Sequence, residues 1–460
     1  MAKQDSVTTG SVERVSFAEA VWTWCRVALL SFGGPAGQMA VMHRIVVDEK
    51  KWISEERFLH ALNYCMLLPG PEAQQLATYI GWLMHRTKGG LAAGLLFILP
   101  GFVAILGLSI LYACYQDTSV VQALFFGLKP AVMAIVLEAV IRIGKRVLKN
   151  GTMIFLAAAS FVAIFFFDVP FPALIAVAAV VGSVGVRFAA DRFDVNQKPA
   201  ATDGKPEDDG NRFESQLTIV QPSVTRSLLI SVVCLTVWFA PLVGVAWLLG
   251  PESTIAKEGV FFSQAAVVTF GGAYSVLAYI AQQAVEKFGW LQPGEMLDGL
   301  GMAETTPGPL IMVVQFVGFM GAYRNPGTLD PLMAGILGSL VTTWATFAPC
   351  FYWIFLGAPY IERLRGNRTV RTALTAITAA VVGVILNLAV WFSLHTLFGT
   401  VTTQEYSGIR VLVPEWSTIS WPGLAIAAFA CVLTFYWKRG MAFTLAVCCI
   451  LGAAVFAVQA

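Results

Sequence analysis

One apolar stretch of the chain is interrupted in its middle by the tripeptide Pro69-Gly70-Pro71. Proline lacks the backbone N–H that an interior helical turn needs, and it disfavours the helical conformation of the residue before it. We therefore expect two half-helices that meet at Gly70. A second such tripeptide, Pro307-Gly308-Pro309, interrupts another apolar stretch. An interrupted helix inside a membrane is costly unless it lines a site, and two at corresponding places indicate a transporter's binding site.

The composition places these stretches in a membrane. Of the 460 residues, 57% are hydrophobic and only 13% are charged, whereas soluble domains carry about 25% charged residues. Many apolar segments are long enough to cross a bilayer, so we expect an all-α polytopic membrane protein. The net charge of +2 and the lack of a basic run give no indication of nucleic-acid binding. The cysteines and histidines are dispersed, so we predict no metal site and no cofactor.

The second half of the chain repeats landmarks of the first half. The segment Thr269–Gly272 follows Ser31–Gly34 by 238 positions, and Pro307–Pro309 follows Pro69–Pro71 by the same distance. A single extra span between two such halves gives them opposite orientations. We therefore predict two inverted-topology repeats, with broken or re-entrant helices at the matched Gly-Gly and Pro-Gly-Pro motifs.

The predicted organisation has five parts, and basic residues in the short loops place its N-terminus in the cytoplasm. These parts are a cytoplasmic tail (1–16), the first transporter repeat (17–188), a disordered cytoplasmic linker (189–225), a connecting transmembrane span (226–250) and the second transporter repeat (251–460).

The path of the interrupted segments stays open on the sequence. They either cross the bilayer fully, which gives 13 spans, or form re-entrant hairpins, which gives nine spans and four hairpins. The two alternatives place loop 41–57 on opposite sides of the membrane. Its basic residues favour the hairpins, although acidic residues lie among them.

The backbone at the breaks is the first candidate for binding. A half-helix that begins at a break presents free N–H groups and a partial positive charge, which suits an oxyanion. Glutamine amides near the breaks can also donate hydrogen bonds. The alternative is that glycine and proline only permit close helix packing. The predicted substrate-binding residues are Arg26, Gly33, Gly34, Gly37, Gln38, Gly70, Gln74, Gln75, Gly271, Gly272 and Gly308.

Charged residues inside apolar segments are the second candidate, because charge in a membrane is costly. Arg26 lies seven residues before Gly33 and could pair with a dianion, or it could extend to the cytoplasmic face. Glu72 and Glu304 flank the Pro-Gly-Pro breaks, and burial would favour their protonated form, so we predict proton coupling there. The alternative is that each carboxylate caps free backbone N–H groups. Secondary candidates in the span 119–141 are Lys129 and Glu138.

At these motifs the sequence resembles the chromate ion transporter family in its long two-domain form, over most of residues 17–397. The resemblance implies proton-motive-force-driven export of chromate from the cytoplasm across a bacterial inner membrane, and hence chromate resistance. Its partners would be chromate, protons and the bilayer, and a homodimer is one option for the assembly. The motifs that carry the resemblance are Ser31–Pro35, Leu67–Gly81, Gly90–Gly101, Thr269–Gly272, Thr306–Leu310 and Ala358–Asn367.

Other functions fit the sequence less well. Sulfate or another tetrahedral oxyanion is the alternative substrate, because helix N-termini do not easily separate two dianions of similar shape. A membrane-embedded oxyanion reductase would need a haem, flavin or metal motif that the sequence does not display. A sensor or scaffold with the 189–225 linker as its output is disfavoured, because the linker has no amphipathic pattern.

Overall fold

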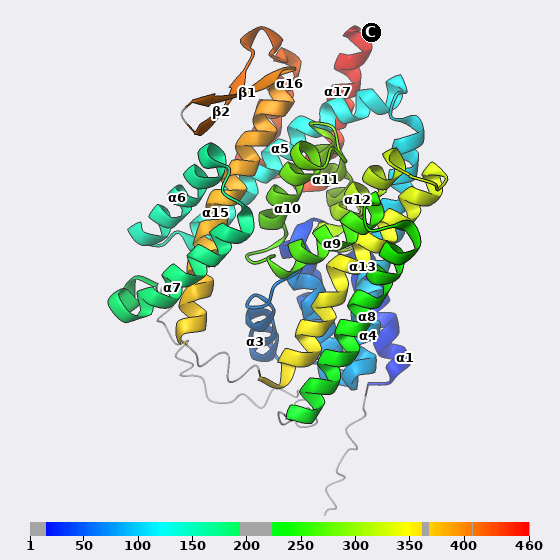
Figure 1. Cartoon of the computed structure of the whole chain (residues 1–460), viewed down its shortest axis with the longest axis vertical. Coiled ribbons are helices and arrows are strands. Elements are labelled where there is room, and N and C mark those ends of the chain that lie inside the picture. The colour runs from blue at the N-terminus through cyan, green and yellow to red at the C-terminus, as the bar shows by residue number, and fades with distance from the viewer. Residues whose placement is uncertain (1–14, 194–222, 361–367, 407, 460) are drawn as a thin grey trace, which may run out of the picture.

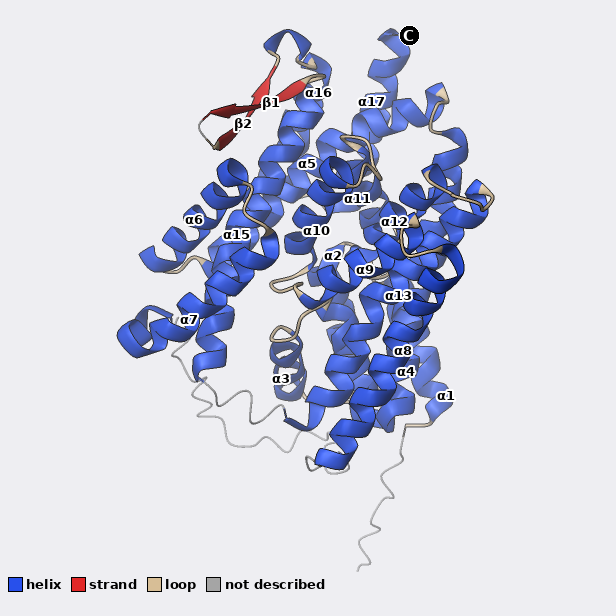
Figure 2. Cartoon of the chain, in the orientation of Figure 1, coloured by secondary structure: helices blue, strands red, loops and turns tan. Residues whose placement is uncertain are grey.

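The computed structural model describes residues 15–193, 223–360, 368–406 and 408–459, so most of the predicted tail and linker lies outside the described residues. The described part is almost entirely helical, with one β-hairpin (Figure 2). Six of its helices are long and apolar enough to cross a membrane, which confirms the prediction of an all-α polytopic membrane protein. We call the end where α1 begins the lower face and the end that carries the β-hairpin the upper face (Figure 1).

The first interrupted segment turns back toward the lower face. Ser16 caps α1 by accepting a hydrogen bond from the Glu19 N–H. Lys50, after the second arm of the segment, forms an ion pair with Glu19 at 2.8 Å. The segment therefore ends near the point where it began. Its elements are α1 (Phe17–Leu30), α2 (Gly34–His43) and the π-helical turn η1 (Arg44–Glu49).

The second interrupted segment returns to the same face through α3 (Glu55–Cys65) and the first arm of α4 (Glu72–Tyr115). The backbone leaves the helical conformation at His85 and Arg86, so α4 consists of two antiparallel arms. The arms pack closely because a Cβ at Gly81 would lie only 2.4 Å from the Gly89 carbonyl oxygen. A hydrogen bond of 2.9 Å joins the His85 ring to the Val15 carbonyl, before α1.

The later half of the chain forms two similar turns nearer the upper face (Figure 1). Trp290, after the first of them, packs against Phe261 of α9. Arg324, at the end of the second, forms an ion pair with Glu295 at its start. The elements are α9 (Thr254–Val267), α10 (Ala273–Gln282), η3 (Gln283–Lys287), α11 (Glu295–Thr305), η4 (Leu310–Met312) and α12 (Val313–Arg324).

The chain path through these four segments is that of the hairpin alternative. The second arm of α4 and the other helices outside the hairpins coincide with the spans that this alternative predicts. They are α5 (Ser119–Val147), α6 (Gly151–Phe167), α7 (Phe171–Phe193), α8 (Val224–Leu249), α13 (Pro331–Gly357), α15 (Arg368–Leu397), α16 (Trp421–Cys431), continued by η7 (Val432–Tyr436), and α17 (Met441–Gln459).

An antiparallel hairpin of β1 (Val401–Tyr406) and β2 (Ile409–Pro414) connects α15 to α16 at the upper face. We did not predict this hairpin. Its strands are short, and much of β1 is exposed, so they lack the burial pattern that identifies a strand in sequence.

Candidate functional site

The four predicted breaks meet in two crossed pairs. The Gly70 N–H donates to the Thr269 carbonyl at 2.8 Å, and the Gly308 N–H donates to the Ser31 carbonyl at 3.0 Å. Each Pro-Gly-Pro break is therefore bonded to the Gly-Gly break of the other half. The Ser31 and Thr269 hydroxyls each donate to a carbonyl four residues earlier, Val27 and Ala265, both at 2.6 Å.

Glycine is required at the breaks for two reasons. The backbone there has positive φ angles, which side-chain-bearing residues rarely adopt. At Gly308 a Cβ would also lie 3.1 Å from the Gly101 Cα, so α4 and this break approach each other closely. The break glycines with positive φ are Gly33 (81°), Gly34 (76°), Gly70 (126°), Gly271 (76°), Gly272 (96°) and Gly308 (101°).

The predicted glutamines support the breaks through their amide N–H groups. Gln38 is buried and donates to the Gly308 carbonyl at 2.7 Å. Gln75 donates to the Pro69 carbonyl at 2.7 Å, and Gln74 donates to the Thr78 hydroxyl at 3.0 Å. These donors are engaged with the protein itself. The backbone N–H groups at the half-helix starts are therefore better candidates for anion binding than the glutamine side chains. At Gly37 a Cβ would meet the Phe32 carbonyl oxygen at 2.7 Å, so this glycine serves close packing.

Glu304 lies between the two halves. Its side chain is buried, and Oε1 accepts a hydrogen bond from the Tyr274 hydroxyl at 2.5 Å. Its Oε2 has no hydrogen-bond partner in the described part of the chain and lies 3.8 Å from the Cβ position of Gly34. The carboxyl group thus faces the start of α2. Sequence reasoning missed Tyr274, which follows Gly272 by two residues and belongs to the first turn of α10.

Two arginines lie in the last part of α5, where the basic residues of the sequence predict a cytoplasmic loop, and one of them approaches a break. Arg142 forms an ion pair of 3.7 Å with Glu138, one turn earlier in the same helix. Arg146 approaches the Pro69–Pro71 break, because its Nη2 lies 3.7 Å from the sulfur of Met66, three residues before Pro69. Both arginine side chains are exposed, so Arg146 presents positive charge near the Pro-Gly-Pro break of the first half.

Arg26 is placed differently from the other candidates. Its guanidinium forms an ion pair with Glu49 at 2.7 Å, and its side chain is 46% exposed. Glu49 belongs to the same hairpin, and Arg44 also approaches it at 3.5 Å. Within the described residues, no hydrogen bond or ion pair joins Arg26 to a break.

Lys129 lies nearer the upper face, where its partly exposed side chain joins a network of buried groups that we did not predict. Its ammonium group is 3.4 Å from Asp298 Oδ2. The Tyr112 hydroxyl donates to the same oxygen at 2.9 Å. One helical turn earlier, Glu295 pairs with both terminal nitrogens of Arg324 at 2.6 and 2.7 Å. Two carboxylates three residues apart in the largely buried α11 were the available signal.

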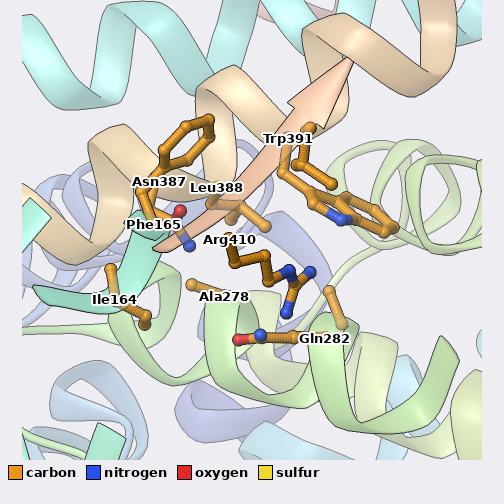
Figure 3. A pocket seen from close by; sticks show the side chains of 10 residues that line it. Ile164, Phe165, Ala278, Gln282, Asn387, Leu388, Trp391 and Arg410 are labelled. Carbon is orange, nitrogen blue, oxygen red and sulfur yellow. The ribbon is translucent and has the colours of Figure 1, made fainter. Parts of the chain in front are cut away.

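A second cluster of ion pairs, centred on Arg410, lies at the upper face. Arg410 of β2 pairs with Asp168 at 3.2 Å and with Glu286 at 2.7 Å. Asp168 follows α6 and Glu286 belongs to η3, so Arg410 connects the two halves. Figure 3 shows its side chain between Trp391 of α15 and Gln282 of α10. The cavity that these residues line has a volume of only about 10 Å³, which is too small for an oxyanion.

Comparison with known proteins gives relatives along most of the chain. A chromate transport protein of Cupriavidus metallidurans is 26% identical over 436 residues, which are 94% of this chain and 97% of that protein. A chromate transport protein of Pseudomonas aeruginosa is 27% identical over 83% of this chain and 82% of its own length. A probable chromate transport protein of Synechococcus elongatus is 25% identical over 85% and 88%, respectively. No solved structure matches the chain.

The family model described as "Chromate transporter" matches residues 18–183 and 257–455, one segment on each side of the predicted linker. These segments cover well over half of the chain, so the protein belongs to the chromate transporter family.

Proposed function

We propose that this protein is a secondary active transporter that exports chromate from the cytoplasm across the bacterial inner membrane. The proton-motive force drives the export, which confers chromate resistance. The observation that carries the proposal is the crossed pairing of the four breaks through Gly70 and Gly308. The names of the relatives, which are chromate transport proteins, supply the substrate.

In this proposal the anion binds where the half-helices begin. The free N–H groups at the starts of α2, α4, α10 and η4 carry partial positive charge and suit a tetrahedral dianion. Arg142 and Arg146 add full charges on the approach to this point. The reciprocal bonds and the two segments matched by the family model support two inverted repeats. One repeat would then rock against the other to give alternating access.

The lower face is assigned to the cytoplasm in this proposal. The basic residues that end α5 follow the usual excess of positive charge on cytoplasmic loops. Arg410 closes the upper face, while Arg142 and Arg146 are exposed on the way to the breaks. This combination corresponds to a form that receives the anion from the cytoplasm.

The membrane potential supplies a large driving force for a dianion. One elementary charge moved across 100 mV changes the free energy by about 2.3 kcal/mol, so a dianion gains about twice that amount. We assign control by protons to Glu304, with Glu72 as the second site. An ionised carboxylate at the start of α2 repels the anion, and a protonated carboxyl group removes that repulsion. The proton state of Glu304 thus determines when the break site accepts chromate.

Chromate uptake into everted membrane vesicles tests this function. We expect energised uptake that collapses with an uncoupler and that excess sulfate inhibits only in part. The variant Glu304→Gln should keep uptake but lose its response to the pH gradient, whereas the exposed Glu415→Gln should behave as the wild type. Absence of chromate uptake together with clear sulfate flux would replace chromate by sulfate as the substrate. Absence of both would refute the transporter proposal.

A further inference from the structure

A second polar cavity lies near the upper face, apart from the breaks. Its volume is about 270 Å³, which corresponds to about nine water molecules at liquid density. Lys129 of α5 lines this cavity. Glu138 follows Lys129 by nine positions in the same helix, toward the breaks, which corresponds to about 13 Å along the helix axis. The cavity is therefore large enough for a tetrahedral oxyanion and lies on the upper side of the break site.

The cation in this cavity is only loosely held. Lys129 is 33% exposed, and its ion pair with Asp298 has a length of 3.4 Å. An ammonium group has three N–H donors, so this contact leaves donors for another partner. The buried Asp298 also accepts a hydrogen bond of 2.9 Å from the Tyr112 hydroxyl. It therefore keeps one hydrogen bond when Lys129 moves away.

Other polar groups of the wall are available to a ligand. The side chains of Gln116 and Gln122 line the same cavity, and amides and hydroxyls donate hydrogen bonds to oxygen.

We propose that this cavity is an anion subsite at the upper face, in which Lys129 leaves Asp298 to bind a tetrahedral oxyanion. The ligand class is the dianion shared by chromate and sulfate. Asp298 is then the internal competitor that holds Lys129 while the subsite is empty. The place of the subsite on the export path rests on the proposed function, but its binding chemistry does not.

Equilibrium binding to the full-length protein in lipid nanodiscs tests the subsite, with chromate and sulfate titrated separately. Lys129→Gln should weaken binding by about tenfold. The free energy of one hydrogen bond to a charged group is large enough to change the affinity by that factor. Asp298→Asn should tighten binding about threefold or more, because it frees Lys129.

The matched control is Lys257→Gln. Lys257 of α9 forms an ion pair of 2.9 Å with Glu252, away from the cavity, so this variant should bind the anion as the wild type does. Opposite shifts in Lys129→Gln and Asp298→Asn support the subsite. Equal weakening in both variants, or no change in either, would overturn it and identify the pair as structural. Vesicle flux separates this result from the proposed function. Opposite shifts in anion affinity without chromate flux would refute the proposed transport but not the subsite. Chromate flux with equal shifts in affinity would refute the subsite but not the proposed transport.

Discussion

The ion pairs of Arg410 should control how often the upper face opens. Arg410 is only 15% exposed and holds Asp168 and Glu286, which belong to different halves of the chain. A hydrogen bond to a charged group contributes about 1.5–3 kcal/mol. Asp168 is 59% exposed, so solvent screens its share toward the small values of surface pairs. We therefore expect Arg410→Gln to favour the open form by about 1.5 kcal/mol, which is about tenfold in population.

The assay uses a cysteine placed beneath this contact. Ala278 is 3% exposed and lines the small cavity next to Arg410. In a protein without its native cysteines, Ala278→Cys should react with a membrane-impermeant thiol reagent at a rate that follows the open population. Arg410→Gln should raise this rate about tenfold from the upper side. Lys257→Gln, which breaks an unrelated ion pair, should leave it unchanged. A rate within twofold of the parent in Arg410→Gln would refute the reasoning.

Three further predictions follow from the described contacts. Gly308→Ala should lower the free energy of unfolding by about 2 kcal/mol or more, because φ at Gly308 is +101° and the new Cβ would meet Gly101. The control is Gly107→Ala, whose Cβ would meet no atom and which should be neutral or slightly stabilising. Thermal unfolding measures both effects. Glu295→Gln should lower the free energy of unfolding by about 2–3 kcal/mol, because it leaves Arg324 without its carboxylate. The control is Glu258→Gln, at a buried carboxyl group that has no hydrogen-bond partner among the described residues, and its effect should stay within about 1 kcal/mol. Equal effects of the two changes would contradict this reasoning. Arg142→Gln should raise the half-saturating chromate concentration in everted vesicles more than Arg26→Gln does, because Glu49 holds Arg26 at 2.7 Å whereas the nearest carboxylate to Arg142, on Glu138, is 3.7 Å away. The reverse order would favour Arg26 as the cation that binds the anion.

The positions of the breaks were predictable because they depend on local stereochemistry. Proline removes an N–H, and a positive φ is easy only for glycine, so Pro69-Gly70-Pro71 interrupts a helix in almost any surroundings. The membrane class was predictable for a similar reason, since apolarity over about 20 residues is itself the requirement for spanning a bilayer. The β-hairpin at 401–414 was missed because its strands carry no long burial pattern.

The partners of the polar groups were not predictable, because they depend on which helices pack together. Gln38 was expected to bind an anion, yet its donor is engaged by a carbonyl 270 positions later, at Gly308. Arg26 was expected near a break, yet Glu49 of its own hairpin holds it. Lys129 was an isolated charge until the fold brought Asp298 to it.

The sequence by itself therefore determined the membrane class, the sites of interruption and the relation to the chromate transporters, because each depends on residues close together in the chain. Only the tertiary structure decided which half each break contacts, which carboxyl group lies between the halves and which carboxylate pairs with each cation. Those properties arise from distances between segments more than 100 residues apart, and no local rule specifies such distances.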